Sequence, residues 1–305
     1  MGHDHSHGLE SAGMRNRGRL AVTFCLGLLV LVVQLIGAAI SGSLALLADS
    51  VHVFADSFGV GLALLAVTVA ARKTKPSRTF GLFRLEILAT VFNGVLLLAL
   101  SGFILYEAWE RWNSPSTIDA PVMLVAAVFG LVANLVGVYL LRRGAQESLA
   151  VKGAYLEVLS DALGSIGVVI AAIVIWTTGW DRADVLVSLA IALFIIPRTF
   201  LLLRDAINVL LESAPPDLDL DEVRAHILAV DGVAEVHDLH AWTITSGMPS
   251  LSAHVFVDPD PYRDGSGSEI LLRLQDCVAD CFGITHTTFQ LESATHSEHE
   301  DVQHP

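Results

Sequence analysis

The chain has 305 residues, of which 53% are hydrophobic and only 16% are charged. This composition is too apolar for an ordinary soluble protein and indicates a membrane protein. The net charge of −14 does not describe the apolar part, because the acidic residues gather after residue 212. We expect no nucleic-acid partner, and membrane lipid as the solvent of the apolar part.

Six apolar runs are long enough to cross a bilayer, which takes roughly 20 helical residues. They predict membrane helices at 20–41, 44–71, 85–111, 119–142, 152–177 and 183–205. The first two are separated by Ser41-Gly42-Ser43, a sequence typical of a tight turn. The first run continues into the second, which argues against a cleavable signal peptide.

Lysines and arginines gather before the first run, between the second and third, and between the fourth and fifth. The alternate loops hold only Arg111 and Arg182. Since positive residues favour cytoplasmic loops, the pattern predicts a multi-pass protein of the cell membrane with both termini in the cytoplasm.

After Pro215-Pro216 the pattern changes to that of a small α+β domain. Helices are predicted at 218–230 and 268–282, and strands at 233–245, 250–258 and 287–292. Asp219 or Asp217 would cap the first helix. This order suits two helices on one face of a three-stranded sheet. The expected organisation is a His-containing tail at 1–18, a membrane domain at 19–212, a cytoplasmic domain at 213–293 and a disordered His-rich, acidic tail at 294–305.

Two pairs of ionisable residues lie inside the apolar runs. His52 and Asp56 are four residues apart, and Glu157 and Asp161 repeat the spacing in the fifth predicted helix, so each pair shares one helix face. A charged side chain costs about 2.5–3.5 kcal/mol at the centre of a membrane helix on insertion scales. One imidazole and three carboxylates match the four ligands of a tetrahedral divalent cation. The sequence therefore predicts a metal site within the membrane.

Other polar residues in the runs have less specific interpretations. Asp49 lies one turn before His52, and the sequence leaves open whether it is a ligand or a structural residue. Three amides are expected to make interhelical hydrogen bonds: Gln34, Asn93 and Asn134. Three cysteines are expected to be small core residues in a reducing compartment: Cys25, Cys277 and Cys281.

Five stretches resemble the cation diffusion facilitator family of divalent-metal exporters: LALLADSVHVFADSF, TFGLFRLEILATVFNG, YLEVLSDALGS, VHDLHAW and HTTFQLE. The resemblance covers Arg19 to Glu292, with the motifs in family order. It implies a homodimer of six-helix protomers, a cytoplasmic ferredoxin-like domain and exchange of metal for protons. It also places the transport site on the second and fifth helices, at His52, Asp56, Glu157 and Asp161.

The resemblance implies further sites near the cytoplasm. It places the metal ligands of the cytoplasmic domain at His237, His254, His286 and Glu292, and an ion pair between the third and sixth helices at Arg84 and Glu212. His240 would be a neighbour of these ligands or of Trp242. Zinc is expected both as transported substrate and as an ion bound in this domain, with no other cofactor.

Two departures from the family pattern bear on the metal. Zinc-transporting members often have His where this chain has Glu157, and carboxylate favours harder cations than imidazole does. Zinc remains the first choice because His52 is retained, with cobalt, cadmium, iron(II) and manganese left open. The loop RRGAQESLAVKG lacks the histidine run of many relatives, so any gathering of metal would fall to tails such as HDHSH.

The chain contains no P-loop sequence, so protons are the expected energy source. His52 is the expected proton-coupling group, because an imidazole ordinarily titrates near pH 6.5.

The main alternative is a membrane metal sensor without net transport. An intramembrane metalloenzyme is disfavoured because HExxH is missing, so no enzymatic activity is expected. An organic-cation transporter would need an aromatic-lined cavity.

Overall fold

The computed structural model of the chain describes residues 17–70, 77–114, 116–146, 149–258 and 267–293. Residues 1–16 of the first tail, the whole tail 294–305 and residue 71 of the second predicted helix lie outside these ranges. The chain forms two compact units, one of residues 1–62 and 92–203 and the other of residues 63–91 and 204–305. Each unit is described by itself below.

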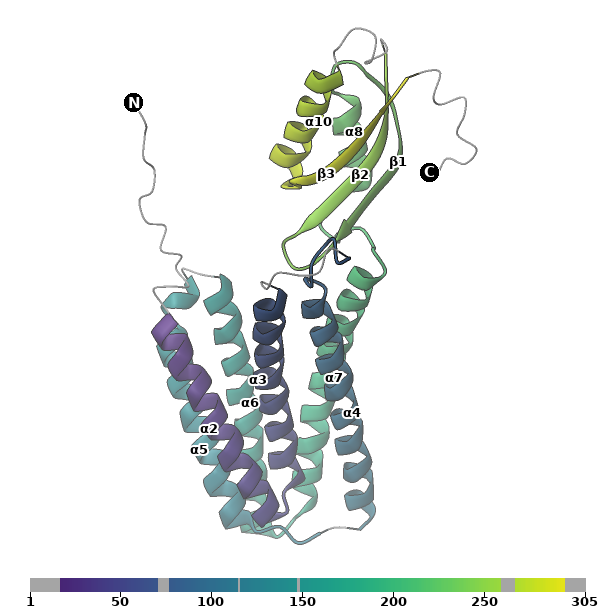
Figure 1. Cartoon of the computed structure of the whole chain (residues 1–305). Helices are drawn as coiled ribbons and strands as arrows, with labels where there is room; N and C mark the ends of the chain where they lie inside the picture. The colour runs from purple at the N-terminus through teal and green to yellow at the C-terminus, as the bar shows by residue number, and fades with distance from the viewer. Residues whose placement is uncertain (1–16, 71–76, 115, 147–148, 259–266, 294–305) are drawn as a thin grey trace, which may run out of the picture. The chain divides into compact units, whose positions relative to one another are not determined.

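Six long helices follow the predicted spans closely. They are α2 (Arg17–Ser41), α3 (Leu44–Ala70), α4 (Leu85–Asn113), α5 (Ala120–Leu141), α6 (Leu149–Thr178) and α7 (Arg182–Leu210) (Figure 1). Each contains a stretch long and apolar enough to cross a membrane, which confirms the prediction of six spans. α7 runs past residue 205 to Leu210 and includes Pro197 in its interior. A short 3₁₀ helix, η1 (Gly144–Gln146), follows α5.

The turn between α2 and α3 lies at Ser41-Gly42-Ser43, as predicted. Gly42 has a φ of 72°, a conformation that a residue without Cβ adopts at little cost. The first N–H groups of α3 have no partner within the helix, and Asp184 of α7 supplies one. Its carboxylate accepts from Leu44 N at 2.7 Å, Ala45 N at 3.1 Å and Ser43 Oγ at 2.5 Å. α7 therefore fixes the beginning of α3.

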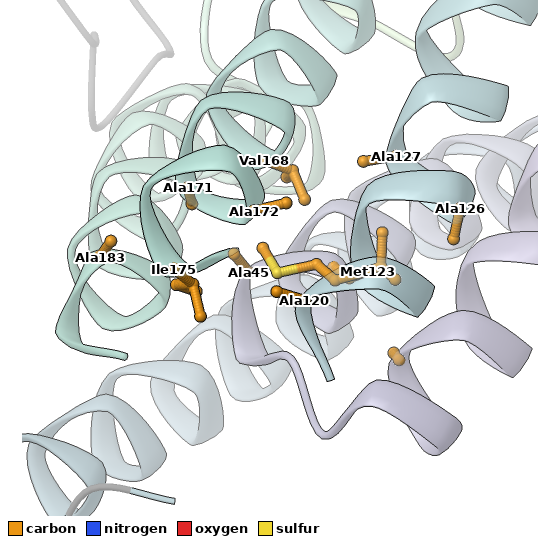
Figure 2. Close-up of a cluster of buried hydrophobic side chains, with 12 residues drawn as sticks. Ala45, Ala120, Met123, Ala126, Ala127, Val168, Ala171, Ala172, Ile175 and Ala183 are labelled. Carbon is orange, nitrogen blue, oxygen red and sulfur yellow. The ribbon is translucent and has the colours of Figure 1, made fainter. Parts of the chain in front are cut away.

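The core of the helical unit consists mainly of small side chains. A buried cluster of twelve residues draws on α2, α3, α5, α6 and α7, and eight of the twelve are alanines (Figure 2). Small side chains allow helix backbones to approach closely. Gly37 of α2 shows how close: a Cβ there would lie 2.5 Å from the Cβ of Ala126 in α5.

The small domain has the predicted order of elements. It comprises α8 (Leu220–Leu228), β1 (Val233–Thr243), β2 (Pro249–Val257), α10 (Gly267–Phe282) and β3 (His286–Glu292). The sheet order is β1-β2-β3, with β1 and β2 antiparallel and β2 and β3 parallel. The parallel pair requires a crossover connection, which α10 provides. Figure 1 shows α8 and α10 on one face of the sheet, as predicted.

The ends of these elements show why the domain folds this way. Asp219 caps α8 by accepting from the N–H groups of Asp221 and Glu222, which resolves the earlier choice between two caps. Alternate residues of the strands pack against α8 and α10 in one apolar core. The register shifts between His237 and His240, and Asp238 there has a φ of 46°. This bulge keeps Val236 and Leu239 in the core.

The cysteines depart from the sequence expectation. All three are free, but Cys25 and Cys281 are exposed and Cys277 is half-buried. They are therefore not small core residues. Cys25 faces outward from a membrane helix, where an apolar thiol is compatible with lipid, so apolar context in the sequence did not imply burial in the protein.

Candidate metal sites

Three of the four residues predicted for the membrane site come together between α3 and α6. Nε2 of His52 lies 3.6 Å from Oδ2 of Asp56 and 3.5 Å from Oδ1 of Asp161. Each side chain offers a ligand atom within 4.8 Å of the others. Both ring nitrogens of His52 and these two carboxylate oxygens are buried without a hydrogen-bond partner among the described residues. Such atoms are costly to bury alone, and a bound cation would satisfy them together.

Glu157 lies beside this group, one turn before Asp161 in α6. Its Oε1 atom is 3.7 Å from Nη2 of Arg198 in α7, and its carboxyl also lies within hydrogen-bonding reach of Asp56. The structure therefore brings three predicted ligands together and holds the fourth between the group and an arginine.

Asp49 belongs to a buried hydrogen-bond network rather than to the group of ligands. Its Oδ2 accepts from Nε2 of Gln34 at 2.6 Å and from Oγ of Ser165 at 3.1 Å. Asn134 in turn donates to Ser165 at 3.4 Å. The network links α2, α3, α5 and α6 and favours the structural interpretation of Asp49.

The amides of the apolar runs make the expected interhelical bonds. Gln34 and Asn134 do so in the network around Asp49, and Asn93 of α4 donates to the carbonyl oxygen of Ala55 in α3 at 3.1 Å. Since Ala55 precedes Asp56, this bond also ties α4 to the backbone of the membrane site.

Two residues of the membrane unit were missed in the sequence. Arg198 contacts Glu157, and Asp184 caps α3, the helix that carries His52. Both are ionisable residues within a predicted span, and such residues normally have a partner in membrane proteins. That signal was present, but nothing in the local sequence identified the partner.

A second group lies in the small domain, on the sheet face opposite the helices. His237 and His254 are register partners on β1 and β2, and Phe256 of β2 pairs with Glu292 of β3. Nδ1 of His254 is 2.8 Å from Oε1 of Glu292, and Nε2 of His237 is 3.3 Å from Oε2. Glu292 is only 1% exposed. Two imidazoles and a carboxylate within 4.8 Å of one another are a donor set that suits zinc.

Within this chain the structure does not bring His286, the fourth expected ligand, into this group. His286 begins β3 and Glu292 ends it. Six residues of extended strand separate their Cα atoms by roughly 20 Å. His286 instead lies edge-on to Phe80, with ring centroids 6.0 Å apart. His240 is exposed and also outside the group, one register step beyond the bulge.

The expected ion pair between the ends of two helices is present. Nη2 of Arg84, just before α4, lies 2.7 Å from Oε1 of Glu212, just after α7. Both side chains are exposed, so the pair contributes little to stability. Glu212 has a φ of 58°, which marks the end of α7 as a sharp turn.

Comparisons with known proteins cover nearly the whole chain. The family model of the cation efflux transmembrane domain matches residues 20–211, and that of the cation efflux protein cytoplasmic domain matches residues 215–294. The metal cation efflux system protein CzcD of Cupriavidus metallidurans is 42% identical over 304 residues, covering 100% of this chain and 94% of that protein.

More distant relatives are covered almost as fully. The cadmium, cobalt and zinc/H(+)-K(+) antiporter of Bacillus subtilis is 37% identical, covering 97% of this chain and 94% of that protein. The zinc transporter ZitB of Escherichia coli is 36% identical, covering 96% and 93%. A solved structure of the metal-bound C-terminal domain of the CzcD transporter is 45% identical, covers 25% of this chain and 99% of that one, and has a TM-score of 0.22.

Proposed function

Because the chain belongs to the cation efflux family, also called the cation diffusion facilitator family, we propose that it exports divalent metal cations from the cytoplasm in exchange for protons. The export site is His52, Asp56 and Asp161, with Glu157 as the fourth ligand. The relatives named for cadmium, cobalt and zinc support a divalent metal as the substrate.

One observation carries the proposal: the buried imidazole of His52 faces one oxygen of Asp56 and one oxygen of Asp161, from two membrane helices, and both ring nitrogens and both of these oxygens are buried without a hydrogen-bond partner among the described residues. A structural role would pair these atoms with donors, as it does for Asp49. A site that binds and releases a cation must instead leave its ligand atoms available.

Zinc is the first choice of substrate. Zinc accepts both imidazole and carboxylate ligands, and the proposed site offers one imidazole and three carboxylates. The excess of carboxylates keeps harder ions such as manganese within the range of the site. Cobalt, cadmium and iron(II) are the other candidates.

Protons provide the energy in this proposal. Moving two charges against 100 mV costs about 4.6 kcal/mol, from about 2.3 kcal/mol per charge. Metal ligands must be deprotonated to bind, so metal and protons compete for the same atoms. His52 touches both Asp56 and Asp161, so a proton taken up by its ring would weaken the hold of the whole group on a cation. We therefore assign the coupling to His52.

The direction, the assembly and the domain boundaries complete the proposal. Lysine and arginine in alternate loops favour cytoplasmic termini, and the chain would act as a homodimer in the cell membrane. The membrane domain would span residues 19–212 and the cytoplasmic domain 213–293. His237, His254 and Glu292 would hold zinc in the cytoplasmic domain, where the ion would join the three strands.

The test is metal flux into vesicles that contain the purified protein, with a metal dye and a pH dye inside. Asp161→Asn keeps the size of the side chain and removes the ligand charge, so flux should fall to the level of empty vesicles. Asp205→Asn, an exposed aspartate of α7, should retain flux. Wild-type flux in Asp161→Asn would remove this residue from the site. Metal binding without flux in the wild type would favour a sensor.

The same vesicles test the proton assignment. In His52→Asp the site keeps four ligands but loses its imidazole, so the number of protons moved per metal, or its dependence on pH, should change. If both match the wild type, the coupling belongs to the carboxylates instead.

A further inference from the structure

Arg198 is a charged residue within the apolar part of α7, and nothing in the predicted site accounts for it. It directly follows Pro197, and apolar stretches lie on both sides of the segment Pro197-Arg198-Thr199. An arginine in a membrane helix is expected to have a partner or to reach water. Its partner is Glu157, whose Oε1 lies 3.7 Å from Nη2 of the arginine.

The arginine acts on the whole membrane site rather than on one residue. Its charge interacts electrostatically with His52, Asp56, Glu157 and Asp161. α7 also borders the site through a cavity of about 260 Å³, lined by residues that include His52, Phe194 and Ile195. α7 therefore forms a third wall of the site, beside α3 and α6.

The charges explain what the arginine contributes. With three ionised carboxylates and a neutral imidazole, the four ligands carry a charge of −3. The positive charge of Arg198 brings the sum to −2. One divalent cation then neutralises the site, whereas without the arginine the loaded site would retain a negative charge that is costly to bury.

We propose that Arg198 is a built-in counter-ion of the transport site: it pairs with Glu157 while the site is empty and yields this carboxylate to the divalent cation. This inference rests on the proposed function of the site. The arginine and the metal compete for one ligand, so Arg198 lowers the affinity for metal and speeds its release. A transporter needs both, because a cargo that is held too tightly is not delivered.

The competition predicts a particular pattern in the variants. Arg198→Gln makes the site more anionic and frees Glu157, so zinc should bind about tenfold more tightly, with a lower KM and a lower maximal flux. Arg198→Lys keeps the charge. Because the observed contact is a single one, we expect lysine to restore affinity and flux to within about twofold of the wild type.

Zinc affinity is measured on the purified full-length protein by competition with a chelating dye. All proteins in this experiment carry His254→Ala, which removes a ligand of the cytoplasmic group so that binding reports the membrane site. Arg204→Gln is the matched control, because Arg204 is an exposed arginine of the same helix, and it should leave affinity and flux unchanged. Flux is recorded in vesicles with the same proteins.

A second background tests the partner. In Glu157→Gln the arginine has no carboxylate to hold at 3.7 Å and acts on the other ligands only through its charge, so adding Arg198→Gln should raise zinc affinity by clearly less than the tenfold expected in the presence of Glu157. Equal effects in the two backgrounds would overturn the pairing.

Unchanged or weaker zinc binding in Arg198→Gln would overturn the counter-ion role, and so would a lysine variant that behaves like the glutamine variant. These outcomes are distinct from failure of the proposed function, in which the wild type itself would move no metal.

Discussion

Asp184 offers a prediction about the stability of the membrane unit. This aspartate is fully buried and accepts three hydrogen bonds at the beginning of α3, two of them from backbone N–H groups. Asp184→Ala would leave these donors without their partner. An unsatisfied buried donor costs about 1–3 kcal/mol. Loss of the partner of all three donors should therefore lower the free energy of unfolding by about 3–6 kcal/mol, because water partly hydrates the freed donors.

Asp119 provides a matched comparison at the beginning of α5. It is an exposed N-cap that accepts from Val122 N at 3.2 Å. Replacing such a cap by alanine costs typically about 1 kcal/mol. The two substitutions are chemically identical, and they differ in burial and in the number of donors left behind.

The assay is thermal unfolding of the purified protein in one detergent, followed by the monodisperse fraction that remains after heating. One kcal/mol corresponds to roughly 2–4 °C in a protein of about this size. Asp184→Ala should therefore lower the midpoint by about 6 °C or more, and Asp119→Ala by only a few degrees. Equal losses in the two variants would refute the interpretation that Asp184 holds α3 in place.

Three further predictions concern the two metal groups and one thiol. Glu157→His makes the membrane site softer and less anionic, so the ratio of zinc to manganese flux should rise; an unchanged ratio would exclude a role in metal choice. In the Asp161→Asn background, where the membrane site lacks a ligand, His254→Ala should weaken zinc binding at least about tenfold, whereas His286→Ala should not. A similar loss of zinc affinity in both variants would return His286 to the site. Burial raises the pKa of the Cys277 thiol, so in a protein with no other cysteine its alkylation should require a higher pH than that of free cysteine. A midpoint at or below that of free cysteine would contradict the burial.

The elements were predictable because hydrophobicity and bilayer thickness determine them. Each membrane helix needs about 20 apolar residues, and the small domain alternates between clear helical and strand patterns. The error at α7 has the same origin. The charged pair Arg204-Asp205 suggested the end of the span, but the mainly apolar residues 206–210 continue the helix to Leu210.

The membrane site was only partly predictable. Spacing along one helix placed His52 beside Asp56, because residues four apart share a face. Periodicity does not say which helices are neighbours, so the approach of Asp161 to His52 was inferred from the chemistry of the two residue pairs and from the family resemblance. The contacts of Arg198 with Glu157 and of Asp184 with Ser43, which is 141 residues away, depend on tertiary packing in the same way.

The separation of His286 from the other expected ligands has a different cause. The family resemblance placed both ends of HTTFQLE in one site. A strand rises about 3.3 Å per residue, so the seven residues of β3 separate its ends by more than the span of a metal site. Only Glu292, at the far end of the strand, reaches the histidines of β1 and β2.

The alanine-rich cluster in Figure 2 bears on how the helices can move. The alanine side chain is a single methyl group without rotamers. Alanines of neighbouring helices therefore interdigitate little, and the helices can slide by a fraction of a turn without any side chain changing its rotamer. Leucines that interdigitate would lock the same helices in one register. A larger residue at Gly37, where a Cβ would already meet Ala126, would act as a wedge against such sliding.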